Sequence, residues 1–324
     1  MSVAEAYGFN FAQEPCEHFL TRKWACRKCL PCLHRRQQEW VARLTEELRQ
    51  HDNNYYLTFT YEDSFLPVDE YGQMCFDKQR IIKLHRDLRK RFQEGRFRNP
   101  CFHDIAGSPE YFPLPRDVHF KYYLTSEYGP EESGATQRPH YHAVYYGLGI
   151  DIYTAELLFK SLWPDGFIRC LPAWPGSAGY ISKYLVKDVS TNGDAYEDDT
   201  RMSPVAIMSK GLGLSYVDRM KSWHQSDPKR TFFQYHGEKK VLSRYYRDKL
   251  YPKSKEGEEP TPFDAPRLKA EEEFNKRNDV MREAYYRFKI DHPEAYIRLM
   301  RERQKYFADL AYNEKQLNLK KHVK

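Results

Sequence analysis

Two histidines, His140 and His142, are one residue apart in the segment 139–146, whose composition predicts a β-strand. Because side chains alternate along a strand, both imidazoles are expected on the same face of a sheet. A pair of imidazoles can bind a divalent cation. Two histidines at this spacing also occur by chance on exposed strands, so the pair predicts a metal site only together with a further ligand.

Glu127 can supply that further ligand. It ends the predicted strand 118–127, and the turn-forming residues 128–134 predict a hairpin between this strand and the histidine strand. The hairpin would bring the carboxylate to the sheet face that carries the imidazoles, and three protein ligands would leave coordination positions open for a substrate. The alternative is that Glu127 is an ordinary solvated residue of the hairpin.

Two tyrosines, Tyr180 and Tyr184, are four residues apart in the predicted helix 176–187, so both phenols are expected on one helix face. Lys183 and Lys187 belong to the same helix, and a cation beside a phenol stabilises the phenolate and neutralises phosphate. The pair therefore predicts two phenols that reach one active site. In a chain with 26 tyrosines, simple packing is the alternative.

Four cysteines lie in one N-terminal segment, Cys16 followed by Cys26, Cys29 and Cys32 with two residues between successive members of the triplet. In a reducing compartment such a cluster favours metal binding over disulfides. Tetrahedral zinc needs four ligands, and either Cys16 or His34 could complete the set. An iron–sulfur run needs a fourth cysteine three residues after the triplet, which the sequence lacks, and free thiols are the third interpretation.

The composition is that of a charged protein with room for one large domain or two modest ones. The 324 residues are 40% hydrophobic and 30% charged, and the mean hydropathy is −0.85. No apolar run approaches the roughly 18 residues that a membrane-spanning helix requires, and the first residues lack the features of a secretory signal. We therefore expect no membrane association and a reducing cytoplasm as the location.

Basic residues are gathered rather than spread, although the net charge is only +6. The segment 78–98 carries nine Lys and Arg against two acidic residues, which favours a polyanionic partner such as nucleic acid. A solvated helix face is the alternative. The candidate DNA-binding residues are Lys83, Arg86, Arg89 and Lys90 in this segment, with Arg35 and Arg36 in a basic N-terminal helix.

The elements that must position these residues follow from composition and periodicity. Strands are predicted at 55–61, 118–127, 139–146 and 166–170, and helices at 78–94, 153–163 and 176–187. The order β-α-β-β-α-β predicts an α+β fold of the split-βαβ type, an antiparallel sheet with helices on one face. Residues 95–117 are expected to form a long loop.

Three regions are expected along the chain. Residues 1–50 form a Cys-rich segment with a basic helix, residues 51–215 form the sheet domain, and residues 216–324 form a polar linker with a helical accessory region. The stretch 188–260 is expected to be mostly irregular. Apolar residues at helical spacing after residue 261 predict a helix pair interrupted at His292-Pro293.

The motifs together resemble those of the HUH-superfamily rolling-circle replication initiators, in particular the initiators of microviruses of the gokushovirus group. The resemblance covers about residues 24–215. It is carried by the motif order: LTFTY at 57–61, EYG at 127–129, RPHYH at 138–142 and the tyrosine pair at 180 and 184. Several motifs in one order are more specific than any of them alone.

The resemblance implies an HUH endonuclease fold and a role for each matching residue. His140 and His142 correspond to the histidines that hold Mg²⁺ or Mn²⁺, and Glu127 to the third ligand. Tyr180 and Tyr184 correspond to paired nucleophiles, and Lys183 and Lys187 match lysines of the same helix.

The resemblance also implies a function. Such a protein nicks single-stranded DNA at the replication origin of a small circular viral genome, forms a covalent 5′-phosphotyrosine intermediate and later rejoins the ends. No GxxxxGK[ST] motif for ATP is present, so host helicase and DNA polymerase are the expected partners. The expected location is the cytoplasm of a bacterial host.

Two other functions remain open. One is a non-catalytic single-stranded nucleic-acid binding protein with an RRM-like sheet, which would stack bases on surface aromatics. The other is a relaxase-like plasmid mobilisation protein, a family that usually places its tyrosine before the histidine motif. The candidate stacking residues are Tyr56, Tyr122, Tyr123, Tyr141 and Tyr145.

Overall fold

The computed structural model describes the chain in two compact units, which are treated separately below. One unit contains the described residues of Trp40–Tyr184 and those up to Ser215, and the other contains the described residues up to Glu39 and from Tyr216 onward. The structure describes residues 2–322 except 15–17, 22–25, 27–28, 102–106, 108, 130–136, 185–201, 203, 228–229, 231, 236–237, 253, 255–258, 260 and 262–263.

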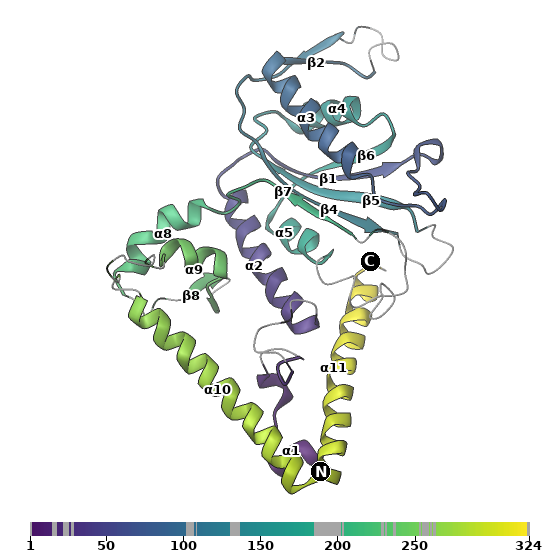
Figure 1. The fold of residues 1–324 in the computed structure, drawn as a ribbon. Coiled ribbons are helices and arrows are strands. Elements are labelled where there is room, and N and C mark those ends of the chain that lie inside the picture. Colours follow the sequence, from purple (N-terminus) through teal and green to yellow (C-terminus); the bar gives the residue numbers. More distant parts are fainter. Residues whose placement is uncertain are drawn as a thin grey trace. The chain divides into compact units, whose positions relative to one another are not determined.

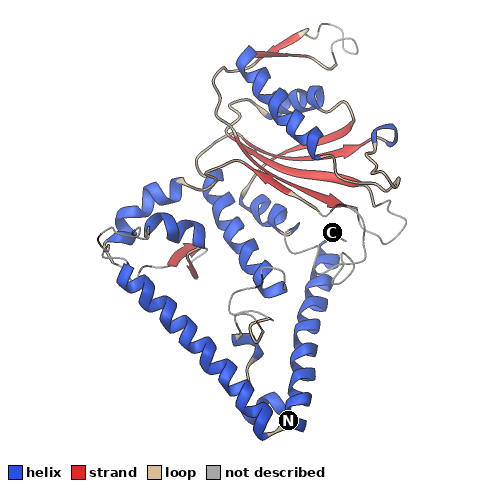
Figure 2. Ribbon diagram, in the orientation of Figure 1, coloured by secondary structure: helices blue, strands red, loops and turns tan. Residues whose placement is uncertain are grey.

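A five-stranded antiparallel sheet forms the centre of the first unit, in the order β6-β1-β5-β4-β7 (Figures 1 and 2). Its strands are β1 (Asn54–Tyr61), β4 (Lys121–Tyr128), β5 (Pro139–Tyr146), β6 (Gly166–Pro172) and β7 (Ala206–Met208). Helix α3 (Lys78–Glu94) connects β1 to β4, and α4 (Ile152–Leu162) connects β5 to β6. The split-βαβ order predicted from the sequence is confirmed, with β7 added at one edge.

One face of the sheet is apolar and is covered by α3 and α4. Leu57 and Phe59 of β1 are fully buried against Leu84 and Leu88 of α3 and Phe159 of α4, within one hydrophobic core. Burying each such side chain contributes roughly 1.5–3 kcal/mol. This face therefore provides the stability of the domain.

Four of the five tyrosines considered for base stacking belong to the protein interior. Tyr122, Tyr123, Tyr141 and Tyr145 are each 8% exposed or less, so the expected surface platform is wrong for them. Tyr56 is half-buried and lies on the opposite sheet face from the apolar core. The candidate tyrosines therefore do not form the exposed aromatic surface that an RRM-like binding mode requires.

Helices also lie on the second face of the sheet, so the expectation of helices on one face alone was incomplete. The second face is contacted by α5 (Pro175–Ser182) and by the last part of α2 (Leu30–Leu48). Trp40 of α2 has its ring 4.9 Å from the ring of Tyr123. The site face is thus partly enclosed rather than open.

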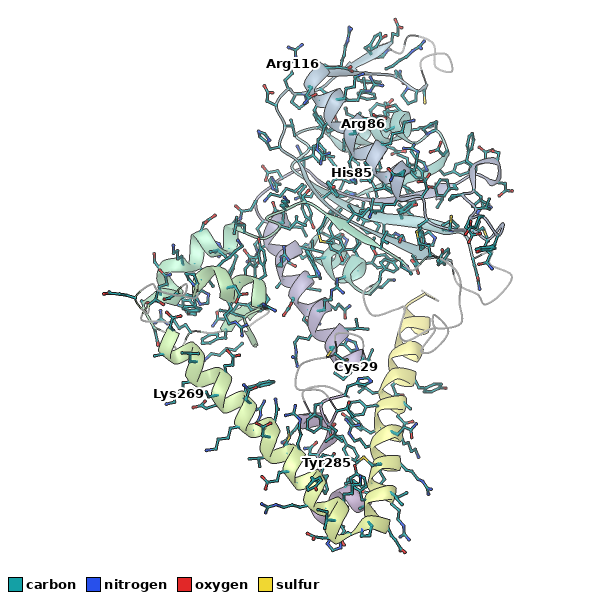
Figure 3. The ribbon with its side chains drawn as sticks, viewed as in Figure 1. Cys29, His85, Arg86, Arg116, Lys269 and Tyr285 are labelled. Atoms are coloured by element: carbon teal, nitrogen blue, oxygen red, sulfur yellow. The ribbon has the colours of Figure 1, made fainter. Side chains whose placement is uncertain are left out.

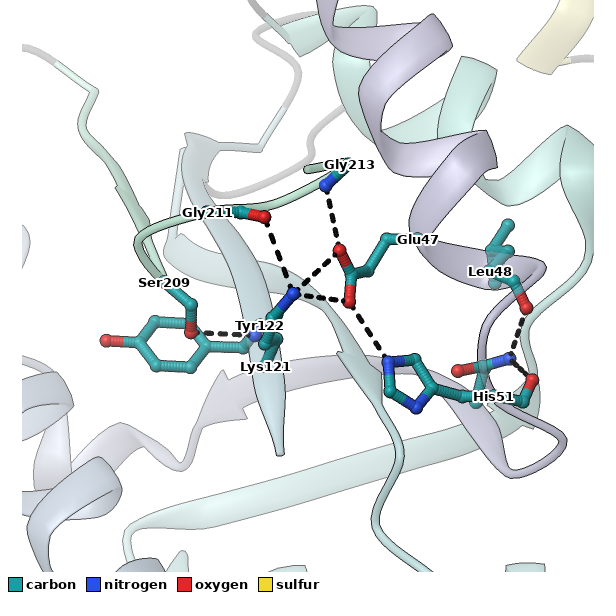
Figure 4. A network of polar contacts seen from close by, with 9 residues as sticks. Glu47, Leu48, His51, Lys121, Tyr122, Ser209, Gly211 and Gly213 are labelled. Carbon is teal, nitrogen blue, oxygen red and sulfur yellow. Dashed lines mark hydrogen bonds and ion pairs between the residues drawn. The ribbon is translucent and has the colours of Figure 1, made fainter. Parts of the chain in front are cut away.

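A buried polar network centred on Glu47 joins three elements behind this face (Figure 4). The Glu47 carboxylate, 1% exposed, accepts hydrogen bonds from Lys121 Nζ at 3.1 Å and from the Gly213 backbone N–H at 2.8 Å, and it lies 3.0 Å from His51 Nε2. Burial alone would raise the pKa of this carboxyl, but these donors outweigh burial and the pKa lies below its usual value. The network fixes the turn after β7, where Gly211 adopts φ 76°.

Two stretches contain more regular structure than the sequence predicted. The expected loop at 95–117 contains the short paired strands β2 (Arg96–Arg98) and β3 (Tyr111–Pro113), with a 3₁₀ helix at Asp63–Phe65 elsewhere in the unit. The expectation that 188–260 is mostly irregular is wrong for the described residues, because short elements are specified there by pairing and packing rather than by long periodic patterns. They are β7, α8 (Ser215–Gln225), β8 (Phe232–Tyr235), β9 (Glu238–Val241) and α9 (Arg244–Leu250).

In the second unit, two long helices form a hairpin. Helix α10 (Asp264–Asp291) ends before Pro293, where α11 (Pro293–His322) begins, and the predicted break at His292-Pro293 is confirmed. The N-terminal segment, with α1 (Val3–Tyr7) and a 3₁₀ helix at Phe11–Gln13, packs on this hairpin. No described helix is both long enough and apolar enough to cross a membrane.

A buried histidine in the apolar core predicts an acid sensitivity of the fold. His85 of α3 is 3% exposed, stacks on Tyr122 with ring centroids 3.6 Å apart, and lies 3.0 Å from the Tyr145 hydroxyl. Burial, followed by the nearby Arg89, lowers its pKa to about 3. The unfolded chain therefore binds a proton below pH ~6.5 that the folded chain refuses until about pH 3.

We expect the free energy of unfolding to fall as the pH drops from 6.5 towards 3, with His85 contributing up to ~1.4 kcal/mol per pH unit. His85→Gln should reduce this slope, measured by urea unfolding at several pH values in that window. The slope should not vanish, because the pKa values of His140, His142 and His224 are also lowered by burial. Exposed His119→Gln is the control, and a slope unchanged in His85→Gln would contradict the assignment.

Candidate metal and tyrosine site

The structure brings the three predicted metal ligands together on the second face of the sheet. The β4–β5 pairing places Glu127 directly opposite His140, and the two-residue period places His142 on the same face. Glu127 Oε2 lies 3.2 Å from His140 Nε2 and 3.1 Å from His142 Nε2. The hairpin expected from the sequence is therefore the element that assembles this cluster.

The donor set fits a divalent cation. Its ligand atoms all lie within 4.8 Å of one another, and the two carboxylate–imidazole separations approach the ~3.0 Å edge of an octahedron with bonds of about 2.1 Å. Burial lowers the pKa of His140, and burial, then His140 and Lys183, lowers the pKa of His142 to about 2. Both imidazoles are therefore neutral at physiological pH and carry a lone pair for a metal ion.

Two residues that the sequence predictions did not assign to the cluster hold His142 from behind. The Tyr56 hydroxyl lies 2.6 Å from His142 Nδ1, and Thr58 Oγ1 lies 3.3 Å from the same atom. With Nε2 directed at Glu127, a proton on Nδ1 would be donated to these oxygens and would fix the ring orientation. The period-two pattern of β1, with Tyr56 and Thr58 on one face, was the signal that could have indicated this role.

The two tyrosines lie at the cluster, but in different environments. Tyr184 is 4% exposed and stacks on His142, with ring centroids 4.6 Å apart and an interplanar angle of 4°. Tyr180 is 44% exposed and its ring lies 5.8 Å from that of Tyr184. Burial, followed by the neighbouring Tyr56, raises the pKa of Tyr184 well above its usual value. Of the two phenols, that of Tyr180 is the one open to a macromolecular substrate.

Of the two lysines expected beside these tyrosines, Lys183 lies at the site. Its Nζ is 3.7 Å from the ring centroid of Tyr180 and 5.0 Å from that of Tyr184. Helix α5 ends at Ser182, so Lys183 and Tyr184 occupy the turn that follows it. Lys187 lies outside the described residues.

The predicted basic residues are exposed, but they are not gathered at this site. The four candidates on α3 lie on the helix surface away from the sheet, and this helix covers the face opposite the metal cluster. Figure 3 labels exposed Arg86 beside buried His85 on this helix. Arg35 and Arg36 are exposed as well, and they belong to the other unit.

The cysteine cluster is partly as predicted. Cys26 and Cys29 lie close together in the second unit with Cys32, whereas Cys16 lies outside the described residues. The predicted alternative His34 does not join them in the metal-competent group. That group contains His18 in addition to Cys26 and Cys29, and the sequence predictions did not include His18.

Comparison with known proteins places the sheet unit in a family. Residues 54–189 match the family of the replication-associated protein ORF2. The sheet domain belongs to this replication-associated family. The matched residues include the whole of the Glu127, His140, His142 cluster and both tyrosines, so the family segment and the site coincide.

Three curated relatives of this replication-associated domain come from small bacterial viruses. They are the replication-associated proteins VP4 of Bdellovibrio phage phiMH2K (28% identical, covering 69% of this chain and 66% of the relative), ORF2 of Spiroplasma virus 4 (25% identical, 59% and 56%) and ORF4 of Chlamydia phage 1 (24% identical, 59% and 45%). The match thus spans about two thirds or less of each relative's length. The resemblance to microvirus initiators is confirmed, and no solved structure matches the chain.

Removing the Tyr56 hydroxyl should weaken metal binding without removing a ligand. We expect Tyr56→Phe to lower Mn²⁺ affinity by roughly 10-fold, because the hydroxyl that orients the His142 ring is then missing. Isothermal titration calorimetry on the full chain measures this, with exposed Tyr71→Phe as the control. His140→Ala should abolish the binding, and a wild-type dissociation constant in either the Tyr56 or the His140 variant would contradict the assignment.

Proposed function

We propose that this protein is a replication initiator of a small circular DNA virus, an HUH endonuclease that nicks single-stranded origin DNA and later rejoins the ends. The observation that supports it most directly is an exposed phenol, Tyr180, beside a buried carboxylate–histidine cluster. The family match at residues 54–189 and the names of the viral relatives support the coarser assignment to replication. The proposed substrate is single-stranded DNA at the viral origin.

Glu127, His140 and His142 would hold a Mg²⁺ or Mn²⁺ ion. Such an ion supplies polarisation of the scissile phosphate when it is bound. Tyr56 and Thr58 hold the His142 ring in the orientation that directs Nε2 towards Glu127. The chain's own residues thus prepare a partly buried carboxylate–imidazole cluster at which a phosphate would meet Tyr180.

In the proposed reaction, the Tyr180 oxygen forms a bond to phosphorus while the bond from phosphorus to the 3′ oxygen breaks. The phenol proton passes to solvent, and the 3′ oxygen takes up a proton to become the free 3′-hydroxyl that primes synthesis. The tyrosine keeps the 5′ phosphate as an ester, which preserves the bond for later rejoining. Lys183, 3.7 Å from the Tyr180 ring, would favour the phenolate and bind the phosphate.

Tyr180 would act first and Tyr184 second. The exposed fractions of 44% and 4% favour this order, because DNA must reach the first nucleophile before any rearrangement. Tyr184 would then attack the regenerated origin, and the released 3′-hydroxyl would close the first strand into a circle. Host helicase and DNA polymerase would supply unwinding and synthesis in the cytoplasm of a bacterial cell.

The alternatives receive less support. Burial of Tyr122, Tyr123, Tyr141 and Tyr145 argues against an RRM-like stacking platform. A relaxase-like mobilisation protein shares the chemistry, but here the tyrosines follow the histidines in the chain. The replication-associated names of the relatives also favour the initiator.

The exchange of tyrosines can be tested with labelled single-stranded origin DNA and Mn²⁺. We expect Tyr180→Phe to lose most of the initial covalent adduct, since the remaining phenol is enclosed. Tyr184→Phe should form the adduct at a near wild-type rate but fail to circularise the strand, because the second transfer lacks its acceptor. A denaturing gel separates the covalent protein–DNA band from free DNA.

The double variant Tyr180→Phe/Tyr184→Phe should form no adduct, and exposed Tyr153→Phe serves as the control. Covalent nicking by the double variant would refute the tyrosine mechanism. Peptide mapping that recovers the phosphotyrosine only at another residue would refute it as well.

The α3 residues are proposed to bind DNA away from the scissile phosphate, because α3 covers the opposite sheet face. Arg89→Glu/Lys90→Glu should weaken binding of a long origin fragment and flatten the salt dependence, by a log–log slope of about 0.7 for each single-strand phosphate that is no longer neutralised. Binding of a short oligonucleotide spanning only the nick site should change little. Fluorescence anisotropy at several salt concentrations measures both, with Lys269→Glu on α10 as the control; unchanged affinity and slope would show a merely solvated face.

A further inference from the structure

We propose that His18, Cys26, Cys29 and Cys32 bind one zinc ion that fastens the N-terminal segment to the α10–α11 hairpin. This site lies in the second unit, apart from the Glu127 cluster and from the proposed nicking chemistry. The ligand set replaces Cys16 and His34 of the sequence prediction with His18. The proposal rests on ligand spacing, on a backbone–sulfur contact and on a prebuilt support.

The ligand atoms are already spaced for a tetrahedral ion. Those of His18, Cys26 and Cys29 lie within 4.8 Å of one another, and Cys26 Sγ lies 3.9 Å from Cys32 Sγ. Zinc–sulfur bonds of about 2.3 Å give a tetrahedron whose sulfur–sulfur edge is ~3.8 Å. The three cysteines form no disulfide, so their sulfurs approach as ligands would.

The local backbone also suits a thiolate. The Cys29 N–H points at Cys26 Sγ from 3.2 Å, and a sulfur that accepts such a bond is favoured in its charged, metal-binding form. The Cys29 carbonyl accepts from Leu33 N–H at 3.0 Å and begins the first turn of α2, which contains Cys32. The start of a rigid helix therefore fixes the positions of two of the three sulfurs.

His18 is held in place from the other side by α10. Arg282 Nε donates to the Phe19 carbonyl at 2.8 Å, and the Phe19 side chain is 2% exposed in a cluster with Tyr285. Cys29 and Cys32 are buried in that same cluster; Figure 3 labels Cys29 and Tyr285. The helix hairpin thus supports both the histidine and the cysteines.

A second contact fixes the chain just before His18. Glu14 is buried, and its carboxylate accepts two hydrogen bonds from Arg303 of α11, at 2.9 and 2.6 Å, and one from the Tyr285 hydroxyl at 2.6 Å. The segment therefore has one polar anchor on each helix, with the ligands following them. A metal ion would add the link between the histidine and the start of α2.

The donor chemistry selects zinc over the ion proposed for the nicking site. Three thiolates and one imidazole are soft donors that suit Zn²⁺, whereas Mg²⁺ prefers oxygen ligands. The two sites should therefore load independently. Zinc content and nicking activity are separate readouts.

The test measures zinc in the full chain, purified under reducing conditions with zinc and then desalted. Elemental analysis should find one equivalent in the wild type and in His140→Ala/His142→Ala, which removes the other candidate site. Cys29→Ser and His18→Ala should lose the zinc, and Cys75→Ser, outside the cluster, should keep it. His18→Cys should retain one equivalent and shift the visible bands of the Co²⁺-substituted protein, which keeps the test valid if Cys29→Ser fails to fold.

Several results would overturn the proposal. One is a folded wild-type protein that holds no zinc, and another is an iron–sulfur absorbance in place of zinc. Zinc retained in His18→Ala with an unchanged Co²⁺ spectrum would exclude His18, especially if Cys16→Ser lost the metal. Loss of zinc in His140→Ala/His142→Ala alone would assign the ion to the sheet site instead.

Discussion

The antiparallel register of β1, β5 and β4 is the constraint on which the site depends. It places Glu127 opposite His140, and Thr58 and Thr125 on either side of His142. Because side chains alternate, a slip of one residue would exchange the buried apolar face with the ligand face. The same hydrogen-bond ladder therefore builds the hydrophobic core and the ligand cluster, and neither can shift without the other.

The two faces of this sheet solve different physical problems. The face under α3 and α4 is closed with large apolar side chains and fixes the register through burial. The other face carries polar residues that are costly to bury alone, and it satisfies them mutually: His142 contacts Glu127 on one nitrogen and Tyr56 on the other. The apolar face thus provides the stability that allows the opposite face to hold a tightly packed polar cluster.

The sequence predicted the elements whose signals are local. Helix α3 was predicted to the residue, because Asp77 caps its start through Arg80 N–H and Gly95, at φ 70°, ends it. The Glu127 cluster was also predictable, since it depends only on alternation and one hairpin. Strand β7 was missed because three residues carry no period, and its position depends on pairing with β4. His18 was missed because it meets the cysteines only through packing on α10 and α11.

The unequal burial of the two tyrosines bears on the proposed double transfer. Tyr184 stacks on His142 at 4.6 Å, so its phenol belongs to the support of the cluster in this conformation, while Tyr180 faces outward. If both act in turn, Tyr184 must leave the His142 ring before it can attack. The place where this can happen is the turn after Ser182, where α5 has ended and no helical hydrogen-bond ladder holds Lys183 and Tyr184 in register. A longer helix through residue 187 would have bound both phenols to one rigid face, whereas the early end of α5 allows the two tyrosines to take different positions during the reaction.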